Sequence, residues 1–265
     1  MGSATREALA ASRAALASSG QADVSVAEDL LAAVRLIAAT GQLRTALTDN
    51  EADEAQKGAL VTGVFGGRIA PGAVSLLTAA ASQRWSSQAD FLDGVEELGL
   101  RIAAGAAGAG VELDAQLFAF ERTVASDSEL ELALGSKLGA NDAKARLVER
   151  LLGTGKADPA TLVVIRHLVL SPRGRRIGEM LRAAAAVIAD QRGFEVATVT
   201  TAVPLSEAQL ARLEQGLAVQ AGRRIRFDTI VDPAVLGGVR VQIGDDVIDG
   251  SVASRLSSLR QKLAG

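Results

Sequence analysis

The chain has 265 residues, of which 48% are hydrophobic and 22% are charged, as is usual for folded globular domains. Its 28 lysines and arginines against 31 acidic residues give a net charge of −3, which is too balanced for a protein that binds nucleic acid through bulk charge. Without cysteine there are no disulfides and no thiolate chemistry, and the single histidine, His167, excludes a multi-histidine metal site within one chain.

We expect no targeting signal in the first residues of the sequence. Arg6 and Glu7 place charge where a signal peptide needs an apolar core. The longest uncharged run, residues 69–83, is shorter than the ~20 apolar residues of a membrane span. We therefore expect a soluble chain that associates with a membrane only through partners.

The first two thirds of the chain are expected to be helical. Apolar residues recur at helical spacing, first at Leu30, Val34, Ile37 and Ala38 and later at Leu181, Ala185 and Ile188. Pro71 and Pro159 each begin a new apolar run, as proline does in the first turn of a helix. Since only 3% of residues are aromatic, the core must consist mainly of Ala, Leu, Val and Ile, which favours closely packed helices.

The helical part is expected to contain a duplication. When the sequence is compared with itself at a shift of 87 residues, similar residues come into register over about 60 positions. The shift becomes 88 residues at Pro71 and 89 residues at Arg84, as if one residue had been inserted before each. The aligned pairs include Leu30 with Leu117, Arg35 with Arg122, Lys57 with Lys144, Pro71 with Pro159, and Arg84 with Arg173. The run Ala103–Gly110, rich in Gly and Ala, lies between the two copies. It is either a flexible joint or the loosened end of a long helix that starts near Ser87, and in both cases it is the best candidate for a hinge in the helical part.

At Gly193 the pattern changes from helical periodicity to alternation. Strands are expected at residues 195–201, 224–229, 239–243 and 247–248, and helices at 206–220 and from Ser251 onward. The sequence thus predicts a mainly α chain with a duplicated N-terminal helical bundle, followed by a small α+β domain of order β-α-β-β-α. The predicted domains are residues 1–110, 111–193 and 194–265.

A search for catalytic or cofactor chemistry finds little. Gly153-Thr154-Gly155-Lys156 lacks the remaining positions of a phosphate loop, and His167 has no evident partner for acid–base work. Trp85 either covers the edge of the core or anchors a partner. The densest basic spot, Arg173, Arg175 and Arg176, is either a solvated helix start after Pro172, a protein-facing surface or an anion site. We therefore expect no catalytic residue, no cofactor and no metal, and a binding or structural role.

The C-terminal sequence carries a specific pattern. Gly237 and Gly238 allow a tight entry into a strand, Gly244 closes a hairpin, and Asp249-Gly250-Ser251 ends it and caps the last helix. That helix places one apolar stripe at Val252, Leu256, Leu259 and Leu263, which is predicted to face the core or a partner. The run from Gly237 to Asp245, continued by Val247 to Val252, resembles the closing segment of the delta subunit of F-type ATP synthases, the family of the mitochondrial oligomycin-sensitivity-conferring protein.

The resemblance implies a function as well as a fold. A delta subunit is a non-catalytic stator, whose helical bundle binds the alpha subunits of the catalytic head and whose C-terminal domain binds the b subunits of the peripheral stalk. The chain would then lie at the cytoplasmic face of the cell membrane, held there by the complex, and Arg173, Arg175 and Arg176 would face the head. The alternative is a helical adaptor that binds nucleic acid or another protein through these three arginines.

Overall fold

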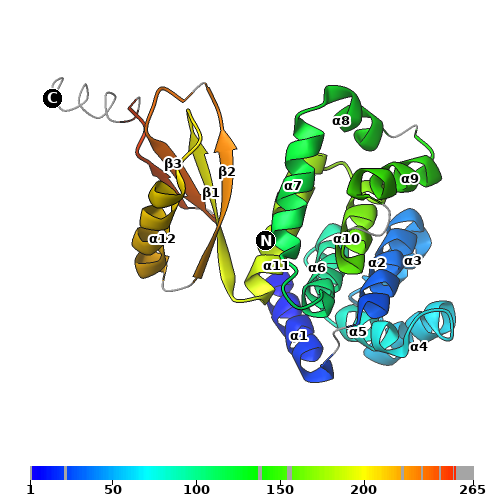
Figure 1. The fold of residues 1–265 in the computed structure, drawn as a ribbon. Coiled ribbons are helices and arrows are strands. Elements are labelled where there is room, and N and C mark those ends of the chain that lie inside the picture. Colours follow the sequence, from blue (N-terminus) through cyan, green and yellow to red (C-terminus); the bar gives the residue numbers. More distant parts are fainter. Residues whose placement is uncertain are drawn as a thin grey trace, which may run out of the picture. The chain divides into compact units, whose positions relative to one another are not determined.

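The computed structural model describes residues 2–20, 23–136, 139–153, 157–221, 224–233, 235–244, 246–252 and 254. The chain divides into two compact units, Met1–Ile188 and Ala189–Gly265 (Figure 1). The first unit is helical and the second combines a sheet with a helix, so the predicted fold class, mainly α followed by a small α+β domain, is confirmed.

The helices of the first unit follow one another with short connections. They are α1 (Ser3–Ser19), α2 (Val24–Ala39), α3 (Gly41–Leu47), α4 (Glu54–Phe65), α5 (Pro71–Ala81), α6 (Gln88–Ala106), α7 (Leu113–Ala125), α8 (Ser128–Gly135), α9 (Asn141–Leu152), α10 (Pro159–Leu170) and α11 (Ile177–Gln191), the last of which continues past the boundary of the unit.

Local sequence explains where several of these helices begin. Asp53 Oδ1 accepts a hydrogen bond from the Gln56 amide at 2.7 Å, and Asp158 Oδ1 accepts one from the Ala160 amide at 2.9 Å. An aspartate at this position pairs a helix N–H group that would otherwise lack a partner. Pro71 and Pro159 occupy the first turns of α5 and α10, where proline loses no hydrogen bond, as the sequence predicts.

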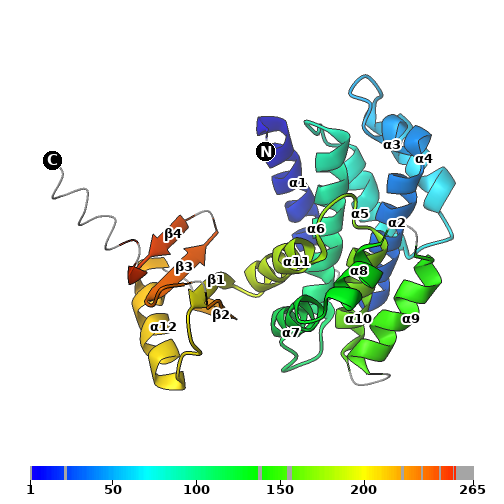
Figure 2. The same ribbon diagram turned by 90° about the horizontal axis from the view of Figure 1, so that it is seen from above.

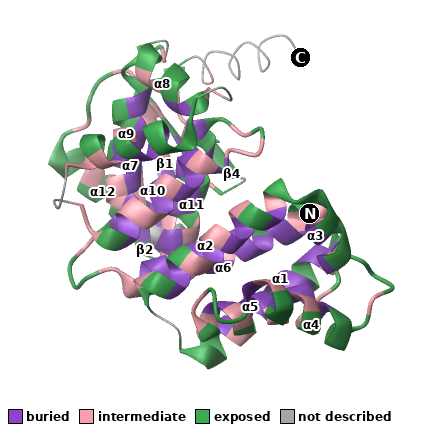
Figure 3. Cartoon of the chain, turned by 90° about the vertical axis from the view of Figure 1, so that its right-hand side faces the viewer, coloured by how far each residue is buried: buried purple, intermediate pink, exposed green. Residues whose placement is uncertain are grey.

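The core of the first unit is centred on α2 and α6, which pack along their length and carry long buried stretches (Figure 3). Gly99 permits this approach, because a Cβ there would lie 2.6 Å from Leu31 Cδ2. Trp85 is part of the core: it is 5% exposed, its indole nitrogen donates to the Ala80 carbonyl at 2.8 Å, and its ring meets Phe91 edge to face. A role for Trp85 as an exposed anchor is therefore excluded.

The helix order repeats at the offsets that the sequence predicts. From α4 to α9 the starts move by 87 residues, Glu54 to Asn141; from α5 to α10 by 88, Pro71 to Pro159; and from α6 to α11 by 89, Gln88 to Ile177. α10 packs on α2 and α6, so helices of both repeats contribute to one compact unit (Figure 2). The finer division at residue 110 stays a prediction.

The second unit contains β1 (Phe194–Thr201), α12 (Glu207–Ala221), β2 (Arg224–Val231), β3 (Val239–Ile243) and β4 (Asp246–Asp249). The sheet has the order β2-β1-β3-β4, with β1 parallel to β2 and the other neighbours antiparallel. Alternate strand residues form the core with one leucine of α12, namely Ala197, Val199, Ile225, Val241 and Leu217. Ser206 and Gln209 form the capping box that begins α12.

The expected last helix lies largely outside the described residues. Val252 and Ser254 are helical, and Val252 is 44% exposed. The other members of the predicted stripe, Leu256, Leu259 and Leu263, belong to the part of the chain that is not described.

Candidate functional site

The predicted basic spot lies in the turn between α10 and α11. Arg173 adopts a left-handed backbone conformation with φ 46°, and Gly174 follows with φ 83°. The Arg175 amide donates to the Pro172 carbonyl at 2.8 Å and closes the turn. A left-handed arginine costs on the order of 1 kcal/mol, so its side chain must be held by favourable contacts.

Those contacts converge on the buried carboxylate of Glu96, on α6. Arg175 binds it with two nitrogens, Nη1 to Oε1 at 2.8 Å and Nη2 to Oε2 at 3.0 Å. Arg173 Nη2 lies 2.5 Å from Oε2, and the Nη1 of the same arginine lies 3.0 Å from Asp93 Oδ1. We refer to five residues together as the Glu96 cluster: Glu96, Arg173, Arg175, and the residues His167 and Arg35, which are described next.

His167 completes the cluster from α10. Its Nε2 lies 2.9 Å from Glu96 Oε2, and its Nδ1 lies 3.1 Å from Arg35 Nη1. A guanidinium has only donors, so Nδ1 accepts from Arg35 and Nε2 donates to Glu96. This assigns His167 the neutral tautomer with its proton on Nε2.

The pKa shifts agree with this arrangement. Burial alone would raise the pKa of Glu96, but the hydrogen bonds from His167 and Arg175 and the charge of Arg173 hold it at about 2. Burial lowers the pKa of His167, and its contact with Glu96 only partly opposes this. At neutral pH the cluster therefore contains an ionised glutamate, a neutral histidine and charged arginines.

The Glu96 cluster suits a structural role rather than catalysis. The His167 side chain is 0% exposed, so no substrate can reach it. Glu96 comes from α6, in the first repeat, whereas His167, Arg173 and Arg175 come from the second, so the cluster joins the repeats. Among the described residues there is no group of three or more histidine or acidic side chains suited to a metal ion.

The sequence analysis named three arginines and His167 but not Glu96. A weak signal was present, since Glu96 lies four residues after Leu92 and four before Leu100, both of which are buried. Such a position predicts a glutamate on the apolar face of α6. Its partners could not be identified, because they lie more than 70 residues away in the chain.

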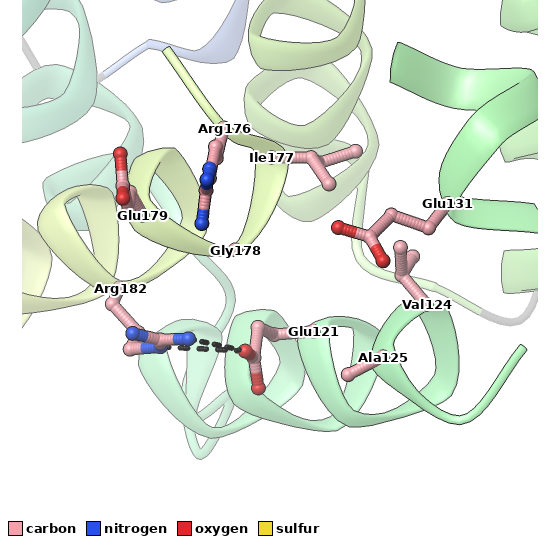
Figure 4. A pocket seen from close by; sticks show the side chains of 9 residues that line it. All are labelled: Glu121, Val124, Ala125, Glu131, Arg176, Ile177, Gly178, Glu179 and Arg182. Carbon is pink, nitrogen blue, oxygen red and sulfur yellow. Dashed lines mark hydrogen bonds and ion pairs between the residues drawn. The ribbon is translucent and has the colours of Figure 1, made fainter. Parts of the chain in front are cut away.

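The third arginine is in a different situation. Arg176 is exposed, and its side chain makes no hydrogen bond or ion pair with any residue that the structure describes. It lines a hollow of about 260 Å³ between α7 and α11, beside the ion pair that Arg182 forms with Glu121 at 2.9 Å (Figure 4). The three arginines thus separate into two that bind Glu96 and one that is available to a partner.

In the second unit, the predicted glycines occupy conformations that favour glycine. Gly237, Gly238 and Gly244 have φ of 79°, 87° and 56°. Gly238 also lies against the backbone, because a Cβ there would be 2.6 Å from the Gly250 carbonyl oxygen. The Gly250 amide donates to the Val239 carbonyl at 2.9 Å, and the Val252 amide donates to the Gly237 carbonyl at 3.1 Å. The double glycine therefore brings the start of β3 against the end of β4.

Asp249 and Ser251 form the junction with the following helix. Asp249 Oδ1 accepts from the Ser251 amide at 2.9 Å. Hydrogen bonding to the Ser251 side chain, and secondly to its amide, lowers the pKa of Asp249. Ser251 Oγ accepts from the Ser254 amide at 3.3 Å, in the position of a helix cap. The segment from Gly237 to Ser251 thereby sets the direction in which the chain leaves the sheet.

Comparison with known proteins identifies the family. The family model described as "ATP synthase delta (OSCP) subunit" matches residues 100–263. The chain is 54% identical over 266 residues to "ATP synthase subunit delta" of Leifsonia xyli subsp. xyli, with all of both chains covered. The chain belongs to the ATP synthase delta (OSCP) subunit family.

Other relatives agree in length as well as in name. A delta subunit of Streptomyces griseus subsp. griseus is 40% identical over 272 residues, again with all of both chains covered. A chain in the mitochondrial ATP synthase hexamer of Toxoplasma gondii is 23% identical, with 64% of this chain and 95% of that chain covered, but its TM-score of 0.43 is too low to support an argument.

Membership of this family makes the chain a non-catalytic stator subunit, a component of the peripheral stalk. In the described part of the chain, no helix combines the length and the apolar composition that crossing a bilayer requires.

The Glu96 cluster makes a first prediction. Glu96→Gln keeps the shape of the side chain but removes the charge that neutralises Arg173 and Arg175, and should lower the free energy of unfolding by on the order of 3 kcal/mol. Urea denaturation followed by circular dichroism measures this change. Glu7→Gln, at an exposed position of α1, should change stability little.

The same variant tests the pH dependence. The pKa of Glu96 is lower in the folded chain than its usual 4.5, so its contribution is complete above pH 4.5 and is lost as the pH falls toward 2. The pKa of His167 is lowered in the folded chain, so below pH 6.5 the unfolded chain binds this proton more readily than the folded chain does. The free energy of unfolding therefore also falls as the pH falls below 6.5. Glu96→Gln should therefore lose less stability than the wild type between pH 4.5 and 2.5. Parallel curves would contradict an ionised Glu96.

The glycine turn makes a second prediction. Gly238→Ala combines an unfavourable φ with a backbone clash and should destabilise the second unit by about 2 kcal/mol or more. Gly216→Ala is the matched control, since that glycine lies in α12 with nothing within 4 Å of an added Cβ, and should stabilise by about 0.5–1 kcal/mol. Hydrogen exchange of the β1 and β3 amides measures both effects.

Proposed function

We propose that the chain links the catalytic head of a proton-driven F-type ATP synthase to its b-subunit stalk. In this proposal the helical unit binds the N-terminal segments of the alpha subunits, and the C-terminal domain, residues 194–265, binds the ends of the b subunits. The joint keeps the head from turning with the rotor, so that torque drives ATP synthesis.

The observation that carries this proposal is the division of a delta-family chain into two compact units with separate cores. A stator joint needs two binding surfaces whose folding does not depend on each other, because each must remain bound under load. Two units with their own cores provide this arrangement. The chain has no catalytic task, so its surfaces are available for binding.

Among the predicted head-facing arginines, we assign the contact to Arg176. Arg173 and Arg175 bind Glu96 and Asp93, so their charge is largely neutralised within the chain. This also weakens the alternative of a nucleic-acid adaptor, which needs several unpaired cations on one surface. We further propose that the complex holds the chain at the cytoplasmic face of the cell membrane.

The division of labour between the units can be tested with a fragment. Residues 1–192 contain all of α1–α11 and should fold as a helical protein that binds the isolated catalytic head and does not bind the b subunits. Circular dichroism and size-exclusion chromatography with each partner measure folding and binding. A folded fragment that binds the stalk and not the head would reverse the assignment.

The predicted stripe of the last helix provides a functional test. Leu259→Asp would place a carboxylate on that apolar face, which is costly at a buried contact. Membranes containing the variant should still hydrolyse ATP but should pump protons poorly, because the stalk joint is weakened. Ser257→Asp, off the stripe, is the control. Normal coupling by Leu259→Asp at full occupancy would show that the stalk is held elsewhere.

A further inference from the structure

A hollow of about 460 Å³ in the helical unit gathers more positive than negative charge. It is lined by residues of α2, α3, α6 and the turn before α11. Its charged lining residues are three arginines and one aspartate, namely Arg44, Arg173, Arg175 and Asp93. In the described part of the chain, the other carboxylate that these arginines reach is Glu96. Three guanidinium groups therefore face two carboxylates, and one positive charge is not balanced.

Arg44 carries the charge that is not balanced. Its Nε donates to Gln88 Oε1 at 2.9 Å and its Nη1 donates to the Ala38 carbonyl at 2.7 Å, and both acceptors are neutral. The Arg44 side chain makes no ion pair with any residue that the structure describes. A guanidinium has five N–H groups, and two of them make these bonds, so three remain. Arg44 is thus a half-buried cation that neutral groups hold in place and that keeps donors for an anion.

The two other arginines are fixed by the Glu96 cluster. Arg175 binds Glu96 with both terminal nitrogens, and its Nε donates to the Pro172 carbonyl at 3.3 Å. Arg173 binds Glu96 and Asp93 through its terminal nitrogens, while its shielded Nε has no hydrogen-bond partner among the described residues. An anion in the hollow would therefore meet guanidinium groups whose positions are already set, and binding would not have to order them.

The hollow at the corresponding place in the second repeat has the opposite balance of charge. It is the hollow of about 260 Å³ between α7 and α11 in Figure 4. The repeat offsets place Glu131 at the position of Arg44, and Arg182 at the position of Asp93. Two further pairs of lining residues correspond, namely Ala38 with Ala125 and Ala89 with Gly178. Three glutamates and two arginines line this second hollow, so of the two hollows the first suits an anion.

We propose that the hollow beside Arg44, which we call the Arg44 hollow, binds an oxyanion of the phosphate class. The planar fork of a guanidinium matches two phosphate oxygens, and one phosphate can accept from more than one arginine. A phosphate group carries more than one negative charge near pH 7, which balances the excess positive charge. The bound anion connects Arg44, in the first repeat, to Arg173 and Arg175, in the second. This inference goes beyond the proposed function and does not depend on which partner each unit binds.

Isothermal titration calorimetry of the full chain with inorganic phosphate, in a chloride buffer of constant ionic strength, tests the proposal. The wild type should bind about one phosphate per chain. Arg44→Glu, which introduces the residue type of the second repeat, should weaken binding at least tenfold. Arg176→Glu is the matched control, because it makes the same change of charge at an exposed arginine of the second hollow, and it should bind within twofold of the wild type.

Three results would overturn the proposal. The first is a wild-type chain that does not bind phosphate. The second is wild-type affinity in Arg44→Glu, and the third is an equal loss of affinity in Arg44→Glu and Arg176→Glu, which would show attraction to the overall charge of the chain. Circular dichroism checks that each variant folds. If Arg44→Glu does not fold, Arg44→Gln replaces it, since glutamine removes the charge but keeps a donor, and it should weaken binding at least threefold.

Two further measurements identify the location and the source of the anion. Phosphate should slow the hydrogen exchange of the α3 amides and leave that of the α8 amides unchanged, and equal protection of both helices would overturn the location. A titration with ATP in the absence of Mg²⁺ then compares two sources of the same group. Tighter binding of ATP than of phosphate, lost in Arg44→Glu, would assign the Arg44 hollow to the phosphate tail of a nucleotide, and weaker binding would assign it to free phosphate.

Discussion

The carboxylate of Glu96 is the interaction on which the arrangement of the helical unit most depends. A buried carboxylate without partners would cost several kcal/mol, so Arg175, Arg173 and His167 must reach it together. This requirement determines the turn before α11, including the left-handed conformation of Arg173. It also determines where α11 begins, and therefore where Arg176 and Ile177 lie.

The cluster belongs to the joint between the repeats and not to either repeat. The repeat offsets pair Glu96 with Ala185 and His167 with Ala79, so neither copy contains the cluster by itself. Lys57 and Lys144, by contrast, occupy equivalent positions and are both buried. The repeated positions thus include buried packing residues, whereas the charged contacts of the Glu96 cluster lie between the two predicted repeats.

The second unit depends on backbone geometry more than on charge. Gly238 lets β3 begin against the Gly250 carbonyl, and Ser251 then starts the next helix. These contacts involve main-chain atoms, so they require glycine at one position and a short polar side chain at the other. A stator subunit transmits force through its surfaces. It therefore needs the rigidity that charged contacts give to the first unit and the rigidity that backbone geometry gives to the second.

Much of this protein could be predicted from local patterns in its sequence. Pro71, Pro159 and the capping residues determine helix starts, alternation after Gly193 predicts the sheet, and the closing glycine pattern identifies the family, because each depends on neighbours within a few residues. Spacing also predicted the offsets at which the helix starts repeat. The Glu96 cluster could not be predicted, since its members lie on α2, α6, α10 and the following turn and meet only after packing. The difference between Arg173 and Arg176 could not be predicted either, because the two arginines are only three positions apart in the sequence. The charge of Arg173 is neutralised by Glu96, whereas Arg176 has no partner among the described residues. Only the tertiary structure decides which of them reaches a buried carboxylate.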